Sequence, residues 1–527
     1  MSEFLINDVA LYVSKTLESA YNGDVVKGQN FAMIRTLQPA YVLPQVEFVN
    51  DAGVPGNGHE FATTWCPTYI TQPAFSYTDD VNFGIAGRLA LRSLGGTVTT
   101  TQQFQSVGTV TISSANPGVV TLNAHGLTAG TAIRFTTTVT LPSNITAGVT
   151  YYVISTGLTP NTFQFSTLAG GGAVDTSGGS PGGTHTLFKL GTVYKHSCNM
   201  LSNTISRQLP SFAIASSLGG ANYRMAGMVV DRFRLSQNRA DRPQYAIDVV
   251  GSGKYETSFE TLATCTISNA NPAVVTVSIP LHGLAAGDQI KFSTDGTLPT
   301  GVTAGQTYFV LPAGLTGNDF QFSSTAGGTP IVTSSAGSGT HTVKYVFPAV
   351  MDIADCLNGA DVVVQWTPPN SNPTFFTGAT CSLRSWFFEV ANNSRLNDRC
   401  PGDPTKAITY NGVTTNPAYV NRLRRGSRTV TAQIVVLLGN TNESWERYVT
   451  GQELTNVTFK AQGNAIGTTG IKYSLNAIIP KARIQSIEPG EVDGEATLTI
   501  NLLGMYDSIS GGAAQVEVIN TETSNYV

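Results

Sequence analysis

Alternation of apolar and polar residues marks much of the chain after residue 220. Residues 223–236 read YRMAGMVVDRFRLS, and residues 382–396 have the same texture. A period of two is typical of β-strands that bury one face against a core. The same reasoning predicts further strands at 244–253, 429–438, 454–463, 471–484 and 496–507.

Two segments of the chain repeat each other in register. Residues 109–136 read TVTISSANPGVVTLNAHGLTAGTAIRFT, and residues 264–293 read TCTISNANPAVVTVSIPLHGLAAGDQIKFS. The match continues until Gly-Thr-His-Thr closes both copies, at 183–186 and 339–342. Short Val, Ile, Thr and Phe runs separated by Gly, Pro and Asn turns predict a small β-sandwich in each copy.

The charge content separates these copies from the rest of the chain. The first copy (106–189) holds three charged residues and the second (263–346) holds five, whereas 12% of the whole chain is charged. We interpret them as modules inserted into exposed loops, where insertions are tolerated best. The remaining residues then form one discontinuous host domain, built from 1–105, 190–262 and 347–527.

Helical patterns are few in this host domain. Residues 5–18, 82–94 and 442–449 favour helices, the last with Asn442 as its N-cap. A strand hairpin followed by one helix therefore occurs twice, which favours a duplicated α+β unit with two sheets, the second unit being about 347–527. The fold class is expected to be mainly β, a β-sandwich or barrel host that carries two small inserted β-sandwich modules.

Composition excludes several other classes of protein. A 41% hydrophobic content over 527 residues supports folded cores, and a net charge of −4 argues against a protein that coats nucleic acid. No apolar run reaches the roughly 18 residues of a membrane span, and acidic Glu3 argues against a signal peptide. The six cysteines form no Cys-x-x-Cys pair, so we expect reduced thiols in a protein made in the cytoplasm.

Motifs that could carry catalysis fit structural roles better. Four histidines occupy equivalent positions of the two modules, without the Cys or carboxylate neighbours of a zinc site, and are expected in turns. GGSPG (178–182) matches the nucleophile elbow, but it lies in a Gly-rich loop with no helix after it. GSGK (251–254) lacks the first Gly and the Ser/Thr of a P-loop. The sequence therefore predicts no enzyme, no metal and no cofactor.

Two charged loops are candidate contact surfaces. The basic run RLRRGSR and the acidic run EPGEVDGE are the sharpest charge features, with Arg422, Arg424, Arg425 and Arg428 in one and Glu488, Glu491, Asp493 and Glu495 in the other. The basic run could contact phosphate, or it could be a solvated hairpin turn. A third reading, preferred to DNA binding, is that the two loops meet when subunits stack head to tail.

The order of the host stretches carries a resemblance to a known family. GMVVDRFRL and YAIDVVGSG come first, followed by GADVVVQW and FEVANNSRL. Then come LRRGSRTVTAQIVVLLGNTNESWERYVTGQELTNVTF, YSLNAIIPKARIQ and LTINLLGMYD. This order resembles the tail tube (major tail) proteins of long-tailed bacteriophages, clearly over 190–262 and 347–527 and weakly over 20–105. The inserted copies resemble the immunoglobulin-like decoration modules of phage tail proteins.

The resemblance implies a structural role in the virion tail. Subunits would form stacked rings around a hollow, net negative lumen through which phage DNA passes without specific binding. Tape measure, tail terminator and baseplate proteins would be further partners, and the chain would be made in the cytoplasm of the host bacterium. Duplication favours rings of three chains with pseudo-sixfold symmetry, with six chains as the alternative.

Two rival functions remain open at this stage. The first is a modular β-sandwich adhesin or tail-fibre-like protein that binds cell-surface glycans, which would also explain the low charge. The second is a glycan hydrolase with binding modules, but no pair of carboxylates at a suitable spacing stands out. Within the tube hypothesis the modules lie on the outer surface, where they cover the tube or contact host glycans weakly.

Overall fold

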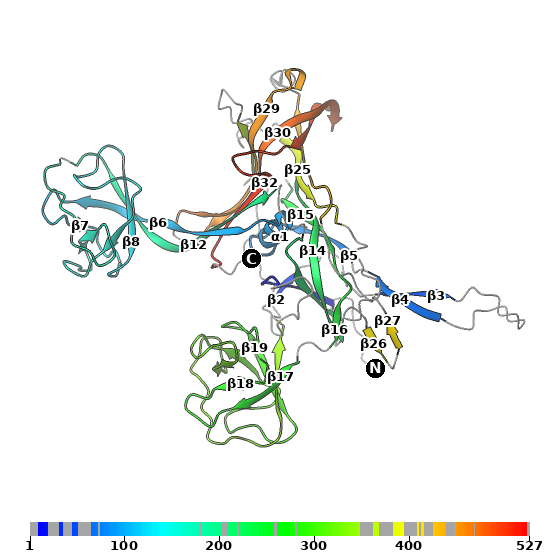
Figure 1. The fold of residues 1–527 in the computed structure, drawn as a ribbon. Coiled ribbons are helices and arrows are strands. Elements are labelled where there is room, and N and C mark those ends of the chain that lie inside the picture. The colour runs from blue at the N-terminus through cyan, green and yellow to red at the C-terminus, as the bar shows by residue number, and fades with distance from the viewer. Residues whose placement is uncertain are drawn as a thin grey trace, which may run out of the picture.

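A computed structural model shows that the protein is mainly β, as the sequence predicts. The structure describes residues 9–18, 31–34, 45–50, 65–71, 74–179, 181–201, 208–218, 221–239, 241–257, 261–279, 282–347, 362–367, 383–394, 408–410, 413–415, 425–438, 448–467 and 469–523. A central host body carries two rounded modules (Figure 1). In the described part of the chain, no helix is long and apolar enough to cross a membrane.

The first unit of the host is organised around one long strand, β14. Its N-terminal half pairs with β13 and β16, and its C-terminal half pairs with β15; β1 extends the sheet from β13, and β5 extends it from β15. The elements of this unit are β1 (Val9–Ser14), β2 (Phe31–Ile34), β5 (Ala74–Asp80), α1 (Ile85–Leu94), β13 (Phe212–Leu218), β14 (Ala221–Asn238), β15 (Gln244–Val250) and β16 (Tyr255–Thr257).

The second unit repeats this pairing around the long strand β30. Its N-terminal half pairs with β29 and β32, its C-terminal half with β31, and β24 and β28 extend the sheet beyond β29 and β31. Residues 448–450 are helical and precede β29, as α1 precedes β13. The strands of this unit are β24 (Val362–Thr367), β25 (Leu383–Ala391), β28 (Thr429–Leu437), β29 (Glu453–Ala465), β30 (Lys472–Val492), β31 (Glu495–Gly504) and β32 (Gly512–Asn520).

A bulge falls at the same place in both long strands and fixes their alignment. The register shifts between Val230 and Arg232 in β14, and between Ile484 and Ser486 in β30, just after each strand begins to pair with the next one. A bulge bends and twists a strand, which lets one long strand serve two differently oriented sheets. By this alignment Arg232 corresponds to Ser486, and Arg234 corresponds to Glu488.

One continuous sheet joins the two units. Strand β25 of the second unit lies between β28 and β14, antiparallel to both. The order is therefore β5–β15–β14–β25–β28–β31–β30, with the C-terminal halves of β14 and β30 taking part. We call this sheet the joint sheet. Phe233, Trp386, Phe388, Ile434 and Ile500 point from it into the main hydrophobic core, and the intervening residues form a polar outer face.

Helix α1 fills the same core and is fixed at both ends. All its residues are buried. At its start the Asn82 side chain accepts the backbone N–H groups of Ile85 and Ala86, at 2.7 and 3.1 Å, which satisfies donors that the helix leaves unpaired. It ends at Gly95, whose φ of 67° is the left-handed conformation that favours glycine after a helix.

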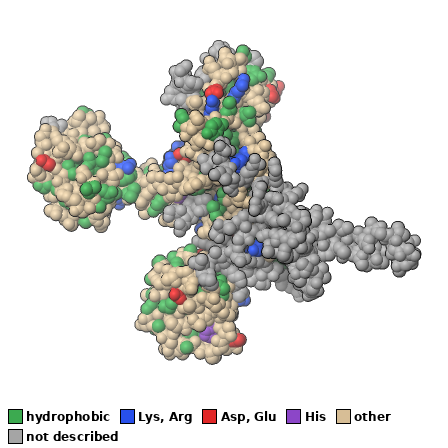
Figure 2. Space-filling model, viewed as in Figure 1, with side chains coloured by type: hydrophobic (Ala, Val, Ile, Leu, Met, Phe, Trp, Pro, Cys, Tyr) green, Lys and Arg blue, Asp and Glu red, His purple; other side chains and the backbone are tan. Residues whose placement is uncertain are grey.

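The two modules share one strand order. Module 1 consists of the ends of β6 (Val98–Ile112) and β12 (His185–Leu201) together with β7 (Val120–Thr121), β8 (Ala132–Thr137), β9 (Tyr151–Val153), β10 (Thr162–Phe163) and β11 (Phe165–Ser166). Module 2 consists of β17 (Thr261–Ile267), β18 (Val275–Val277), β19 (Gln289–Thr294), β20 (Thr307–Val310), β21 (Asp319–Phe320), β22 (Phe322–Ser323) and β23 (His341–Val346). Every strand pair of one module has its counterpart in the other. Figure 2 shows few charged side chains on either surface.

The modules are attached to the host in different ways. Module 1 sits at the end of a hairpin, because β6 and β12 run without interruption from the host into the module (Figure 1). Its core is a separate cluster. The core of module 2, in contrast, is continuous with host residues such as Tyr12, Phe31 and Ala213. Two further hairpins, β3 (Gln45–Asn50) with β4 (Trp65–Thr71) and β26 (Ile408–Tyr410) with β27 (Val413–Thr415), complete the described strands.

Most of the predicted elements are present, and one is wrong. The helix expected at 82–94 is α1, and each strand predicted from alternation is present. The strand predicted at 471–484 is longer than expected, because β30 continues to Val492 and includes part of the acidic run. The helix expected at 5–18 is wrong, because residues 9–14 form strand β1. Its Val, Tyr and Leu side chains pair between β2 and β13, and this tertiary pairing outweighs a weak local preference. Of the helix expected at 442–449, residues 442–447 lie outside the described residues.

Candidate assembly surfaces

The predicted basic surface is divided by the structure. Arg422 and Arg424 lie outside the described residues, whereas Arg425 and Arg428 immediately precede β28. The Arg428 guanidinium points inward: Nε donates to Asn392 Oδ1 at 2.8 Å, and Nη2 donates to the carbonyls of Ser93 and Leu94 at 3.0 and 2.5 Å. Those carbonyls end α1, so Arg428 caps the helix C-terminus, where a cation is favoured. The structure thus gives this residue an internal role.

Burial changes the acid–base character of this arginine. Desolvation, followed by the nearby charge of Arg425, lowers the pKa of Arg428 to about 10. The guanidinium nevertheless stays charged at neutral pH. Because it is held between β25, β28 and α1, its removal would leave helix carbonyls without a donor rather than remove a surface charge.

The acidic run lies at the hairpin that joins β30 to β31. Asp493 and Glu495, at the tip of this hairpin, form ion pairs with Arg239 and Arg384 respectively. Both arginines belong to the same end of the joint sheet, one in the β14–β15 turn and one in β25. These two carboxylates are therefore paired within the chain, although the pairs are solvent-exposed and each contributes little to stability.

Glu488 and Glu491 remain on the exposed arm of the hairpin. Both side chains are exposed, and Glu488 accepts a hydrogen bond from Ser486 Oγ at 3.1 Å. They lie on the part of β30 that pairs with β31 on one side only within the described residues. That the basic run and the acidic run meet between stacked rings stays a prediction for all of their residues.

The outer face of the joint sheet carries two matching polar triads. In the first unit Asp248 links Arg232, at 2.6 Å, to Ser76, at 2.6 Å. In the second unit Asn501 occupies the place of Asp248: its Nδ2 donates to Ser486 Oγ at 2.9 Å, and its Oδ1 accepts from Gln433 at 2.9 Å. Both triads cross three adjacent strands at the bulge. The duplication therefore extends to side-chain contacts, with a charged set in one unit and a neutral set in the other.

Arginines on this face are held by carboxylates. Glu389 lies 3.7 Å from Arg232 and 3.5 Å from Arg234, and Arg234 also stacks over the Phe387 ring at 3.8 Å. The hydrogen bond to Asp248 raises the pKa of Arg232 above its usual range. Sequence analysis missed these residues, although the alternating polar positions of 223–236 were the signal that placed them on one face.

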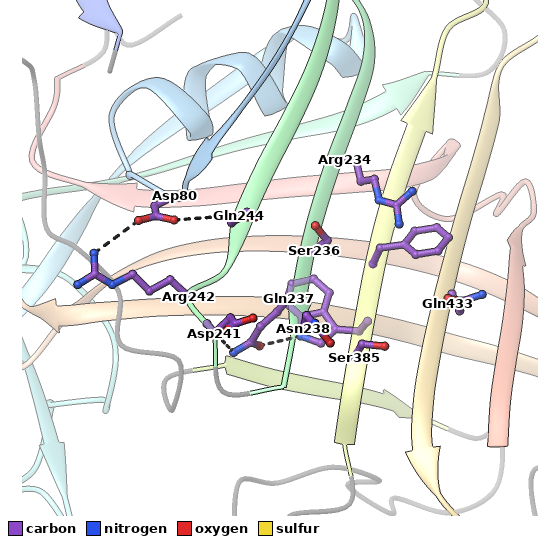
Figure 3. Close-up of a pocket in the computed structure, with 12 residues that line it drawn as sticks. Asp80, Arg234, Ser236, Gln237, Asn238, Asp241, Arg242, Gln244, Ser385 and Gln433 are labelled. Carbon is purple, nitrogen blue, oxygen red and sulfur yellow. Dashed lines mark hydrogen bonds and ion pairs between the residues drawn. The ribbon is translucent and has the colours of Figure 1, made fainter. Parts of the chain in front are cut away.

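A shallow depression of about 510 Å³ opens beside these arginines, lined from β5, β14, β15, β25 and β28 (Figure 3). Asp80 accepts from Gln244 at 3.4 Å and pairs with Arg242 at 3.5 Å. At the far side the buried Trp386 Nε1 donates to Gln237 Oε1 at 2.9 Å. Several polar groups of the depression are therefore paired with one another.

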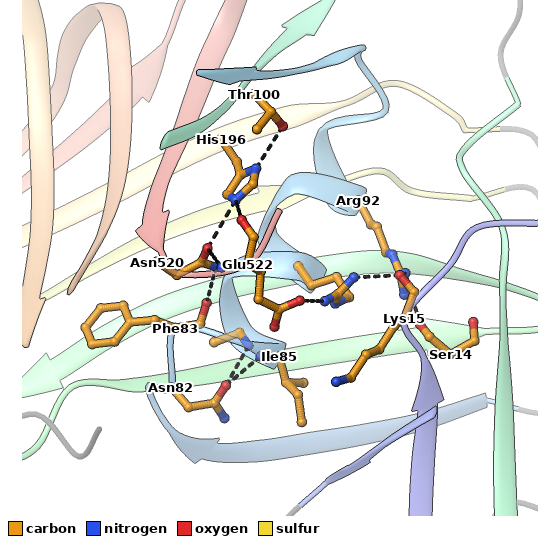
Figure 4. Close-up of polar contacts among 12 residues, drawn as sticks. Ser14, Lys15, Asn82, Phe83, Ile85, Arg92, Thr100, His196, Asn520 and Glu522 are labelled. Carbon is orange, nitrogen blue, oxygen red and sulfur yellow. Dashed lines mark hydrogen bonds and ion pairs between the residues drawn. The ribbon is translucent and has the colours of Figure 1, made fainter. Parts of the chain in front are cut away.

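A polar network beneath the sheet holds α1 in place (Figure 4). Arg88 pairs with Glu522 at 2.6 Å and donates to the Lys15 carbonyl at 2.5 Å. His196 lies 2.9 Å from Thr100 Oγ1 and 3.1 Å from Asn520 Oδ1, and burial lowers the pKa of this histidine. These contacts connect the chain termini of the described part to the base of the β6–β12 hairpin, so they are structural.

Two of the four module histidines, His125 and His282, lie in turns as expected. The expectation is wrong for His185 and His341, which are the first residues of strands β12 and β23. His125 and His282 accept the backbone N–H groups of Leu127 and Leu284 at 3.0 Å, as expected of turn histidines. His341 Nδ1 lies 2.9 Å from Thr294 Oγ1. Among the residues that the structure describes, no three His, Cys, Asp or Glu side chains gather as a metal site.

Among the other motifs and thiols, the structure describes GSGK and two cysteine side chains in full. GSGK forms the turn after β15, where Ser252 Oγ donates to the Ala226 carbonyl at 3.1 Å. Ser180 of GGSPG lies outside the described residues. Cys198 and Cys265 are free and buried, and burial raises their thiol pKa values to about 11 and about 12.

Comparisons with known proteins give matches among solved structures alone. No protein-family model and no curated protein matches the chain. Among solved structures, the SPP1 tail tube aligns at 17% identity with a TM-score of 0.17, over 32% of this chain and 81% of that one. The phage phi92 endosialidase aligns at 10% identity with a TM-score of 0.13, over 95% of this chain and 70% of that one. With TM-scores this low, the function has to be argued from the residues of this chain.

Proposed function

We propose that this chain is a virion structural protein whose copies form stacked rings, and that these rings make the tail tube through which phage DNA is delivered. The observation that carries the proposal is the joint sheet: two units with the same pairing pattern lie side by side, and their polar outer face is continuous across both. A wall made of repeated units is what a closed ring requires. The family resemblance of the host stretches agrees with this reading.

The polar face suits a conduit for DNA. Phosphate backbones bind unpaired arginines strongly, but Arg232 and Arg234 are engaged by Asp248 and Glu389. The remaining positions on this face are mostly Ser, Thr, Gln and Asn, including Ser76, Gln433 and Asn501. We infer that this face lines the lumen, and that DNA moves along it without being held.

The modules project from the host away from the joint sheet, so they would decorate the outside of the tube (Figure 1). Their nearly uncharged surfaces would cover the tube or contact cell-surface glycans weakly. The tape measure, terminator and baseplate would be the other tail partners, and the protein would act in the virion without catalysis or cofactor.

Negative-stain electron microscopy of the purified protein tests the proposal. Hollow tubes or rings of uniform diameter are expected, and the mass per ring would distinguish three chains from six, since the two answers differ twofold. Monodisperse monomers that bind glycans would contradict the tube and support the adhesin instead. Reversal of Arg424 and Arg425 to Glu is expected to shorten or abolish tubes if the basic run joins stacked rings.

A further inference from the structure

The junction between the two units inside one chain shows how neighbouring units can meet. Strand β25 covers the free edge of β14, in a register that runs from Arg232 opposite Ala391 to Asn238 opposite Ser385. On its other side β25 pairs with β28. The internal junction is therefore one strand, β25, placed between an edge of the first unit and an edge of the second.

Side chains on both faces hold this junction together. On the outer face Arg234 meets Glu389 at 3.5 Å, directly across the strand pair. On the core side Phe233 and Val390 are opposite each other and fully buried, and Trp386 donates to Gln237. Opposite charges on facing positions of adjacent strands stabilise a pair and select its partner.

Each end of the joint sheet presents the counterpart of an edge used in this junction. Within the described residues, β30 beyond Ile484 pairs only with β31, and β5 pairs only with β15. The bulge alignment makes this edge of β30 equivalent to the edge of β14 that β25 covers. Likewise, the edge of β5 that faces away from β15 is equivalent to the edge of β28 that contacts β25. Unpaired strand edges are templates for another chain.

The sign of one charge differs between the two edges. Glu488 stands where Arg234 stands in β14, and it is exposed. A strand with Glu389 would therefore be attracted to β14 and repelled by β30. Pro489, directly after Glu488, has no N–H to donate, which confines the usable edge to residues 485–488.

We propose that the ring contact forms where residues 485–488 of one copy face the β5 edge of the next copy. One strand lies between these two edges and pairs with both, as β25 does in the internal junction. Glu488 selects that strand by favouring a cation opposite it. The inference rests on the proposed ring and specifies its interface. Internal and intermolecular junctions would then alternate around the ring, and three chains would supply six junctions.

Cross-linking between two single-cysteine variants tests the contact. Residue 431 is across one strand from residue 234, and Ala74 is the counterpart of Thr431, so Glu488 and Ala74 of adjacent copies should lie about 10 Å apart, two strand spacings. A mixture of E488C and A74C chains, treated after assembly with a bismaleimide of about that length, should give a two-chain band on a denaturing gel. Neither variant alone should give it.

Matched controls keep the outcomes separate. S236C with Q433C in one chain spans the internal junction and should cross-link only within the chain, and wild type reports the background from native cysteines. E488R should lower the fraction of chains that form closed rings at least tenfold. E491R, beyond Pro489 on the same strand, would affect only the stacking of rings, so it should change that fraction less than twofold. The inference would be overturned if the mixed E488C and A74C chains assembled into rings without giving the cross-link, or if E488R and E491R had equal effects on ring formation. Wild-type protein that forms no rings would overturn the proposed function itself.

Discussion

The two inserted modules have the same strands but opposite relations to the host. Module 1 stands on a two-stranded stalk with a core of its own, whereas module 2 shares a core with β1, β2 and β13. Phe31 contacts Phe347 at 5.4 Å between ring centres, Tyr12 contacts the same ring at 4.5 Å, and the Tyr345 hydroxyl accepts the Phe31 N–H at 3.3 Å. One fold is therefore compatible with a projecting or a docked position.

A few residues at the module boundary decide between these positions. Tyr345 and Phe347 of module 2 correspond to Lys189 and Gly191 of module 1. At Gly191 a Cβ atom would lie 1.9 Å from the Gln105 side chain on the facing strand, so the stalk has no room for a larger residue there. The aromatic residues Tyr345 and Phe347 thus favour docking of module 2 on the host, whereas Lys189 and Gly191 favour a two-stranded stalk for module 1.

The largest expected effect comes from removing the aromatic contact. Phe31→Ala deletes a ring that is 2% exposed, and buried Phe-to-Ala changes cost about 3–5 kcal/mol. Hydrogen exchange should become faster in β1, β2 and β23, with module 1 unaffected. The control is Lys189→Ala, at the module 1 position of Tyr345, which should leave exchange in both modules unchanged. Unaltered protection of β23 in Phe31→Ala would show that docking does not depend on this ring.

The next largest effect should be a dependence of the stability of module 2 on pH. Burial raises the pKa of Asp288 from 3.8 to about 7. A hydrogen bond from the Ala285 N–H and the charge of Lys15 both lower this pKa, but burial has the larger effect. The folded protein thus binds this proton more tightly than the unfolded one, so the contribution of Asp288 to stability is fully present below about pH 4 and is lost as pH rises toward 7. Each pH unit in that window costs at most about 1.4 kcal/mol, or roughly 2–3 kcal/mol from about pH 4.5 to 6.5.

Two substitutions sharpen this pH comparison. Asp288→Asn should remove the module 2 component of the pH dependence, measured by hydrogen exchange or by thermal unfolding at several pH values. Thr131→Asp places the same group at the equivalent position of module 1, which is only half-buried, and should create no such dependence. A pH profile that Asp288→Asn leaves unchanged would assign the effect to another group.

The smallest effect concerns the base of module 1. Arg134 stacks over the Phe104 ring of the stalk at 4.0 Å, and its Nε donates to Thr150 at 3.1 Å. Arg134→Lys keeps the charge but loses the planar contact, which is worth about 0.5–1 kcal/mol. Amides of the stalk should exchange slightly faster. The converse change, Lys291→Arg at the equivalent site of module 2, should have no effect on module 1.

Much of the fold follows from local patterns in the sequence. Alternation located the long strands of the host, because this signal is contained within a few tens of residues. The repeat located the modules, because two copies of one pattern can be recognised by comparing two segments of the sequence. The helix predicted at 5–18 failed for the opposite reason. Residues 9–14 take their conformation from β13, about 200 positions away in the chain.

The candidate surface depended even more on distant partners. Arg428 belongs to a basic run in the sequence, yet its role is set by carbonyls at Ser93 and Leu94. In the sequence Asp493 and Glu495 belong to an acidic run with no evident partner, but in the structure they form ion pairs with Arg239 and Arg384. Charge patterns along the chain located the two charged runs, but only the tertiary structure shows which of their charges are paired within the chain.

The stalk of module 1 also makes the chain a natural acceptor for foreign domains. Gln105 and Lys189 are paired across adjacent strands, so the chain leaves and re-enters the host about 5 Å apart. Any domain whose termini lie side by side could be exchanged there, and a short turn could close the hairpin without one. Exchange of genetic cassettes could thus change what the particle displays while the scaffold is preserved.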